Sequence, residues 1–141
     1  MITAAQALEA LAQAVERKGE GYVYTDQATG IRAGTDEWYD KGVDCRYAGP
    51  DGEPACIVGT ALSIADRAAF EAVRVIEAAD GSFPAIHLHR GTKSIPVVAT
   101  ADAANVFYWA QTVQDSGATW GEALGAARKY AAEVAEQEVT A

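Results

Sequence analysis

Apolar residues recur at helical spacing in five stretches of the chain, and most of these stretches carry polar caps at their ends. Thr3 followed by Gln6 has the pattern of a capping box, and Gly19 ends that first helix. Thr119 followed by Glu122 repeats the pattern and opens the last helix. The predicted helices cover residues 3–19, 54–65, 66–81, 100–117 and those from 119 onward.

Other stretches are short and have the alternation or the residue types of strands. Residues 22–25, 85–89 and 95–98 each predict a short strand. Within 85–89 the alternation places His87 and His89 together on one face. With the hairpin described next, these strands predict an α+β fold, in which four or five helices pack around a small antiparallel sheet.

The clearest reversal of the chain is the Pro-Asp-Gly turn at residues 50–52. Proline suits the first central position of a type I turn, and the glycine accepts a positive φ. This geometry pairs Gly49 with Glu53 and brings Cys45 beside Cys56, where a helix begins. The pair is then either a disulfide or two neighbouring thiols.

The helical stretch that follows the hairpin is apolar enough to belong to the core. It also contains Gly59, and a glycine inside a helix costs about 1 kcal/mol relative to alanine. We therefore expect Gly59 to permit the close approach of another element.

Composition indicates one folded domain spanning residues 1–141, since 50% of the residues are hydrophobic and 22% are charged. Eleven Lys and Arg against twenty Asp and Glu give a net charge of −9, so we expect no nucleic-acid partner. The acidic surface either maintains solubility or docks on a basic protein partner by imitating DNA. With no membrane-length apolar run and no signal-peptide pattern, we expect a cytoplasmic protein without membrane association, whose cysteines are thiols.

Four side chains have the chemistry of zinc ligands: Cys45, Cys56, His87 and His89. Ten residues separate the cysteines and the histidines lie two apart, which is not the spacing of a structural zinc site. We therefore expect no metal and no cofactor, and a zinc-site protein remains an alternative.

A cysteine nucleophile is the other candidate chemistry. Cys56 is predicted at a helix N-terminus, where the helix dipole favours a thiolate. His87 or His89 would act as the base and Asp44 or Asp102 would orient it. The alternative function is thus a cysteine-dependent enzyme in which Cys56, His87 and His89 are catalytic.

The long loop at residues 26–41 holds two adjacent aromatic residues, Trp38 and Tyr39. Long loops in compact domains are often functional, and exposed aromatic residues anchor partners. Because the chain has no recognisable catalytic constellation, the first-choice function is a non-enzymatic accessory protein that binds a protein partner through Trp38 and Tyr39.

Three segments of the chain carry a resemblance: ALEALAQAVERKGEGYVYTD at residues 7–26, DCRY and PACIVGTAL within 44–62, and AQTVQDSGATWGEAL at 110–124. They resemble uncharacterised small proteins of actinobacteria and actinobacteriophages. The resemblance implies a cytosolic, phage-related accessory protein with a partner in the host or the phage. It implies no catalytic residue.

Overall fold

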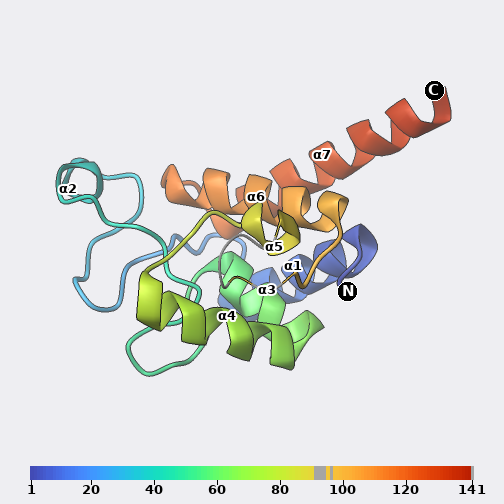
Figure 1. Cartoon of the computed structure of the whole chain (residues 1–141). Coiled ribbons are helices and arrows are strands. Elements are labelled where there is room, and N and C mark those ends of the chain that lie inside the picture. The colour runs from blue at the N-terminus through green and yellow to red at the C-terminus, as the bar shows by residue number, and fades with distance from the viewer. Residues whose placement is uncertain (91–94, 96, 141) are drawn as a thin grey trace.

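The computed structural model describes residues 1–90, 95 and 97–140, and within them the chain forms seven helices joined by irregular segments (Figure 1). The helices are α1 (Ala4–Lys18), α2 (Asp36–Asp40), α3 (Ile57–Ala65), α4 (Arg67–Asp80), α5 (His87–Arg90), α6 (Ala101–Asp115) and α7 (Trp120–Thr140). Helix α3 forms the centre of the core, because its residues 57–62 are all buried and α1, α4 and α6 pack against it. Helix α7 packs against α6 and α1. Among the described helices, none combines the length and the apolar character that a membrane crossing requires.

The predicted α+β fold with a small antiparallel sheet is wrong. In the described part of the chain there is no sheet, only three isolated bridges: Ile2 with Ala99, Thr25 with Arg32, and Ala48 with Pro54. The predicted strand at 22–25 contributes one of these bridges. The predicted strand at 95–98 includes residue 96, which lies outside the described residues, and residues 95, 97 and 98 belong to no strand.

The predicted strand at 85–89 is instead the short helix α5. The N–H of Leu88 donates to the carbonyl of Ala85 (3.0 Å), so the backbone closes a helical turn. Ala85 and Leu88 are both buried. They lie three residues apart, which places them on the same face of a helical turn. In so short a segment the pattern of apolar residues is compatible with a strand and with a single helical turn. The packing of the segment in the folded chain stabilises the turn.

The predicted helix ends are largely confirmed. Thr3 and Gln6 form the capping box of α1, and Gly19 ends that helix with φ 96°. Thr119 and Glu122 exchange the capping hydrogen bonds before α7, with the Glu122 N–H donating to the Thr119 hydroxyl at 3.1 Å. Asp66 caps α4 by accepting two backbone N–H groups. These ends depend on local chemistry, which is why the sequence predicts them.

The predicted turn at residues 50–52 is also confirmed. The N–H of Gly49 donates to the carbonyl of Glu53 (2.9 Å), and Gly52 has φ 80°. The predicted role of Gly59 is confirmed as well, because a Cβ at this position would collide with the backbone carbonyl of Tyr47. The segment that leads into the turn therefore lies directly on α3.

The long segment between α1 and α3 runs along one side of the helices and carries only α2 (Figure 1). Its backbone is held by local bonds: the carboxylate of Asp26 is buried and accepts the N–H of Thr29 (3.0 Å) and its hydroxyl. Such a turn organises a loop without a sheet.

Candidate functional site

Two adjoining cavities open where the end of α6 meets the segment before the hairpin. Their volumes are about 360 Å³ and about 510 Å³, and both are lined by Asp44, Thr112 and Asp115. We call the two cavities together the cleft. The smaller cavity is further lined by Cys45, Ser82, Phe83, Pro84, Tyr108 and Gln111, and the larger by Trp38, Tyr39, Gly42, Val43 and Ser116.

Cys45 lies in the wall of the smaller cavity, with 4% of its surface exposed. Its sulfur accepts a hydrogen bond from Nε2 of Gln111 at 3.4 Å. Its thiol also interacts with the thiol of Cys56 and with the carboxyl of Asp115. The contact with Cys56, followed by burial, raises the pKa of Cys45 well above its usual range.

Cys56 is completely buried and, unlike Cys45, does not line the smaller cavity. It caps α3, since its sulfur accepts the N–H of Gly59 at 3.3 Å. Helix α3 thus begins at Ile57, three residues later than the proline expected to open it. The backbone N–H of Cys56 donates to the carbonyl of Arg46 at 3.0 Å, so the predicted juxtaposition of the two cysteines is confirmed. Both are free thiols.

Asp115 is the titratable group at the centre of the cleft. Burial raises its pKa to about 6, and the negative charge of Asp44 adds to the shift. The hydrogen bond from Nε2 of Gln114 (3.0 Å) and the interaction with the Cys45 thiol lower this pKa in turn. Asp115 therefore takes up or releases a proton close to neutral pH.

Two buried glutamines of α6 hold the walls of the cleft. Oε1 of Gln111 accepts the N–H of Ala85 at 2.8 Å, and its Nε2 donates to the hydroxyl of Tyr47 at 3.3 Å. Oε1 of Gln114 accepts the N–H of Ile57 at 2.8 Å, at the start of α3. Each amide thus bonds a backbone group that has no helix or sheet partner.

Sequence reasoning missed both glutamines and Asp115. A signal was present, because Phe107, Gln111 and Gln114 recur at helical spacing on the buried face of α6. A polar residue within an apolar stripe is a candidate for a buried hydrogen-bonding role.

A buried carboxylate on α4 holds the backbone of the segment that leads into the hairpin turn. Glu77 of α4 is 1% exposed and accepts the N–H groups of Tyr47 (2.8 Å) and Ala48 (3.0 Å). The Arg46 guanidinium is 3.8 Å away. The segment that carries Cys45 is therefore tied to α4 as well as to α6.

His87 and His89 belong to α5 and line neither cavity of the cleft. Nδ1 of His89 is 3.3 Å from the carbonyl of Ala99. Within the described residues, no group of three His, Cys, Asp or Glu side chains is arranged to hold a metal ion.

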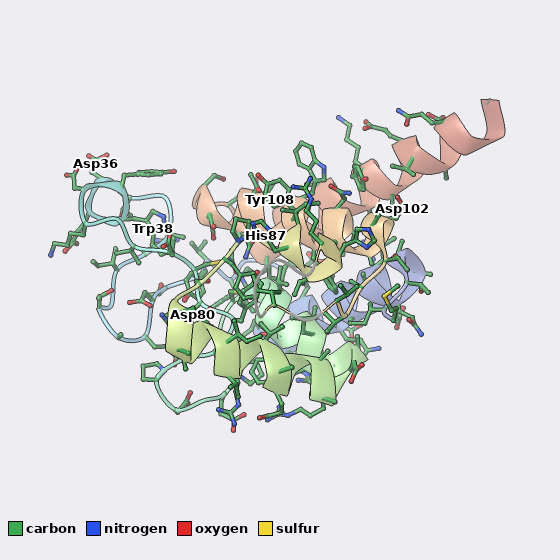
Figure 2. The ribbon with its side chains drawn as sticks, viewed as in Figure 1. Asp36, Trp38, Asp80, His87, Asp102 and Tyr108 are labelled. Carbon is green, nitrogen blue, oxygen red and sulfur yellow. The ribbon has the colours of Figure 1, made fainter. Side chains whose placement is uncertain are left out.

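The two aspartates proposed to orient a base differ in position. Asp44 lines both cavities. Asp102 lies in the first turn of α6 and Asp115 in its last turn, so the helix rise separates them by roughly 20 Å. Figure 2 shows Asp102 at the end of α6 far from Trp38.

The aromatic pair of the loop is divided between core and surface. Trp38 is buried and meets the ring of Tyr24 edge to face, with centroids 5.9 Å apart. Tyr39 is 62% exposed, and both residues line the larger cavity. Tyr108 is exposed on α6 (Figure 2) and lines the smaller cavity. The cleft therefore has an exposed tyrosine in each of its two parts.

No protein-family model, curated protein or solved structure matches the chain.

Proposed function

We propose that the chain is a small accessory protein that binds a protein partner, and that the cleft receives an arginine side chain of that partner. The observation that carries the proposal is the pairing of two carboxylates, Asp44 and Asp115, with two exposed tyrosines, Tyr39 and Tyr108. A guanidinium satisfies both kinds of group, because it hydrogen-bonds carboxylates and stacks on aromatic rings.

The charges around the cleft support a cationic occupant. None of the ion pairs formed within the described part of the chain uses Asp44 or Asp115. A guanidinium placed between them would relieve the repulsion between the two carboxylates and favour ionised Asp115. The net charge of −9 would also steer a basic partner toward this protein.

Tyr39 now carries the partner-binding role expected for the Trp38–Tyr39 pair, because its ring is the exposed one. The resemblance to proteins of actinobacteria and actinobacteriophages directs the search for the partner to an actinobacterial lysate. Cys56 is not proposed as the thiol that attacks a substrate directly, since Cys56 is completely buried and its sulfur caps α3.

The test begins with a photo-crosslinking amino acid at position 39, which is exposed and lines the cleft. We expect one dominant crosslinked partner, with the crosslinked peptide containing arginine. The affinity of this partner is then measured for the wild type, Asp44→Asn and Asp102→Asn. Asp102 is the matched control, because it carries the same charge at the far end of α6 (Figure 2).

We expect Asp44→Asn to weaken binding about tenfold, as loss of one charge-assisted hydrogen bond does, and Asp102→Asn to leave it nearly unchanged. Replacing the partner's arginine with glutamine should produce a similar loss. A crosslinked segment without arginine, or equal affinities of the two aspartate variants, would contradict the proposal.

A further inference from the structure

The thiols of Cys45 and Cys56 have no role in the binding function, yet they form a cluster with a carboxyl group at the wall of an open cavity. Cys45 lines the cavity, whereas Cys56 is completely buried and does not line it. A reagent entering the cleft meets Cys45 first. The sulfur of Cys56 is buried, so a reagent in the cavity does not reach it. Cys56 can therefore react only with Cys45, once Cys45 carries the mixed disulfide.

We propose that Cys45 and Cys56 are a dithiol that reduces low-molecular-weight disulfides, with Cys45 as the attacking thiol, Cys56 as the resolving thiol and Asp115 as the base. The inference does not depend on the protein partner proposed above. It depends on the contacts among the three side chains and on access to the smaller cavity.

The reaction takes place in two exchanges. The Asp115 carboxylate accepts the proton of the Cys45 thiol, and the thiolate attacks a sulfur of the disulfide R–S–S–R. The Cys45–SR bond forms, and one R–S⁻ leaves. The sulfur of Cys56 then attacks the Cys45 sulfur, forming the Cys45–Cys56 bond and releasing the second R–S⁻.

The two exchanges balance in atoms and electrons, so no further oxidant or reductant is needed. The two protons of the cysteines end on the two released thiols, passing through Asp115 and the solvent. The protein loses two electrons, and the disulfide is reduced to two molecules of R–SH. The hairpin permits the product, because the N–H of Cys56 donates to the carbonyl of Arg46 (3.0 Å), the residue next to Cys45, and the two thiols interact.

The walls of the cavity select the charge of the substrate. Asp44 and Asp115 are carboxylates at the route to Cys45, so a disulfide with positive ends is attracted and one with negative ends is repelled. Tyr108 and Phe83 provide apolar surface for a short linear chain. The substrate class is therefore a small cationic disulfide.

The high pKa of Cys45 has two consequences for this chemistry. Little thiolate exists at neutral pH, so the reaction is slow unless Asp115 accepts the proton. Once formed, such a thiolate is a strong nucleophile, since nucleophilicity rises with pKa.

The experiment uses two probes of similar length and opposite charge, cystamine and 3,3′-dithiodipropionate. Each is added to the reduced full-length protein, and intact mass is followed over time. With cystamine we expect a loss of the mass of two hydrogen atoms, reversed by dithiothreitol. The anionic probe should react at least about tenfold more slowly, because of the two carboxylates.

Variants separate the roles of the three side chains. In Cys56→Ser the mixed disulfide should accumulate on Cys45, and in Cys45→Ser no adduct should form on Cys56. The Cys56→Ser variant should fold, because a serine hydroxyl can replace the sulfur as the cap of α3. Asp115→Asn should slow the first exchange about tenfold or more, while Asp102→Asn should not.

Three results would overturn the proposal. One is a native protein whose thiols stay unmodified by cystamine until it is unfolded, as judged by circular dichroism. Another is an adduct on Cys56 in the Cys45→Ser variant. The third is an intermolecular disulfide as the main product. None of these results bears on the partner measurements with Asp44→Asn, so the two proposals fail separately.

Discussion

The replacement of Glu77 by glutamine tests how the irregular segment before the hairpin is held. Both oxygens of the Glu77 carboxylate accept backbone N–H groups, from Tyr47 at 2.8 Å and from Ala48 at 3.0 Å. Glutamine has nearly the same shape but only one acceptor oxygen. Its NH₂ group must therefore face one of the two N–H donors, and that buried N–H loses its partner.

The expected loss of stability follows from these two bonds. A hydrogen bond to a charged group contributes about 1.5–3 kcal/mol, and an unsatisfied buried donor costs about 1–3 kcal/mol. Burial of an amide costs less than burial of a carboxylate, which offsets part of the loss. We expect Glu77→Gln to lower the free energy of unfolding by about 2–4 kcal/mol, a large share of the about 5–15 kcal/mol typical of a domain.

The measurement is urea unfolding at pH 7, followed by circular dichroism, with the slope m checked for constancy. Glu71→Gln is the matched control on the same helix. Glu71 pairs with Arg67 (3.2 Å) and Arg74 (2.7 Å) near the surface, where such pairs contribute up to about 1 kcal/mol each. Amide exchange should also accelerate at residues 47 and 48 in Glu77→Gln only. Equal losses in the two variants would refute the reasoning.

Two further predictions concern Asp115 and Gly59. The folded-state pKa of Asp115 is raised from 3.8 to about 6, so the folded protein holds a proton that the unfolded chain releases, and stability falls as pH rises between about 4 and 6. Asp115→Asn should remove this fall and be more stable than wild type by up to about 3 kcal/mol at pH 7 but not at pH 4, measured by urea unfolding. Equal pH profiles of the two proteins would contradict the prediction. Gly59→Ala gains about 1 kcal/mol of helix propensity, but the added Cβ collides with the carbonyl of Tyr47. We therefore expect the free energy of unfolding to fall by about 1–3 kcal/mol, measured by thermal unfolding. A rise in Tm would contradict the close packing at this position.

Features set by neighbouring residues were predictable from the sequence. The capping box of Thr3 and Gln6, the turn at residues 50–52 and the juxtaposition of the two cysteines each depend on contacts within about a dozen residues. Such contacts leave a clear local pattern, because particular side chains are required at fixed spacings.

Features set by distant residues were not predictable. The segment at 85–89 folds as a helical turn because Gln111, 26 residues after Ala85, accepts the N–H of Ala85. Likewise, Asp115 reaches the cleft through the packing of α6 on α3, and no local pattern connects it with Cys45. The sequence predicts a partner-binding role for Trp38, but this side chain is buried against the ring of Tyr24, which precedes the loop.

The buried polar side chains explain how a site can form on segments that have no sheet. Backbone N–H groups buried in irregular segments need acceptors, and here Glu77, Gln111 and Gln114 provide them from two helices. The same Gln111 bonds the sulfur of Cys45, and the same Gln114 bonds the carboxyl of Asp115. The groups that hold the chain in place therefore also orient the reactive side chains, so the position of the thiol pair in the cleft is fixed by the rigid helices rather than by the loops that carry it.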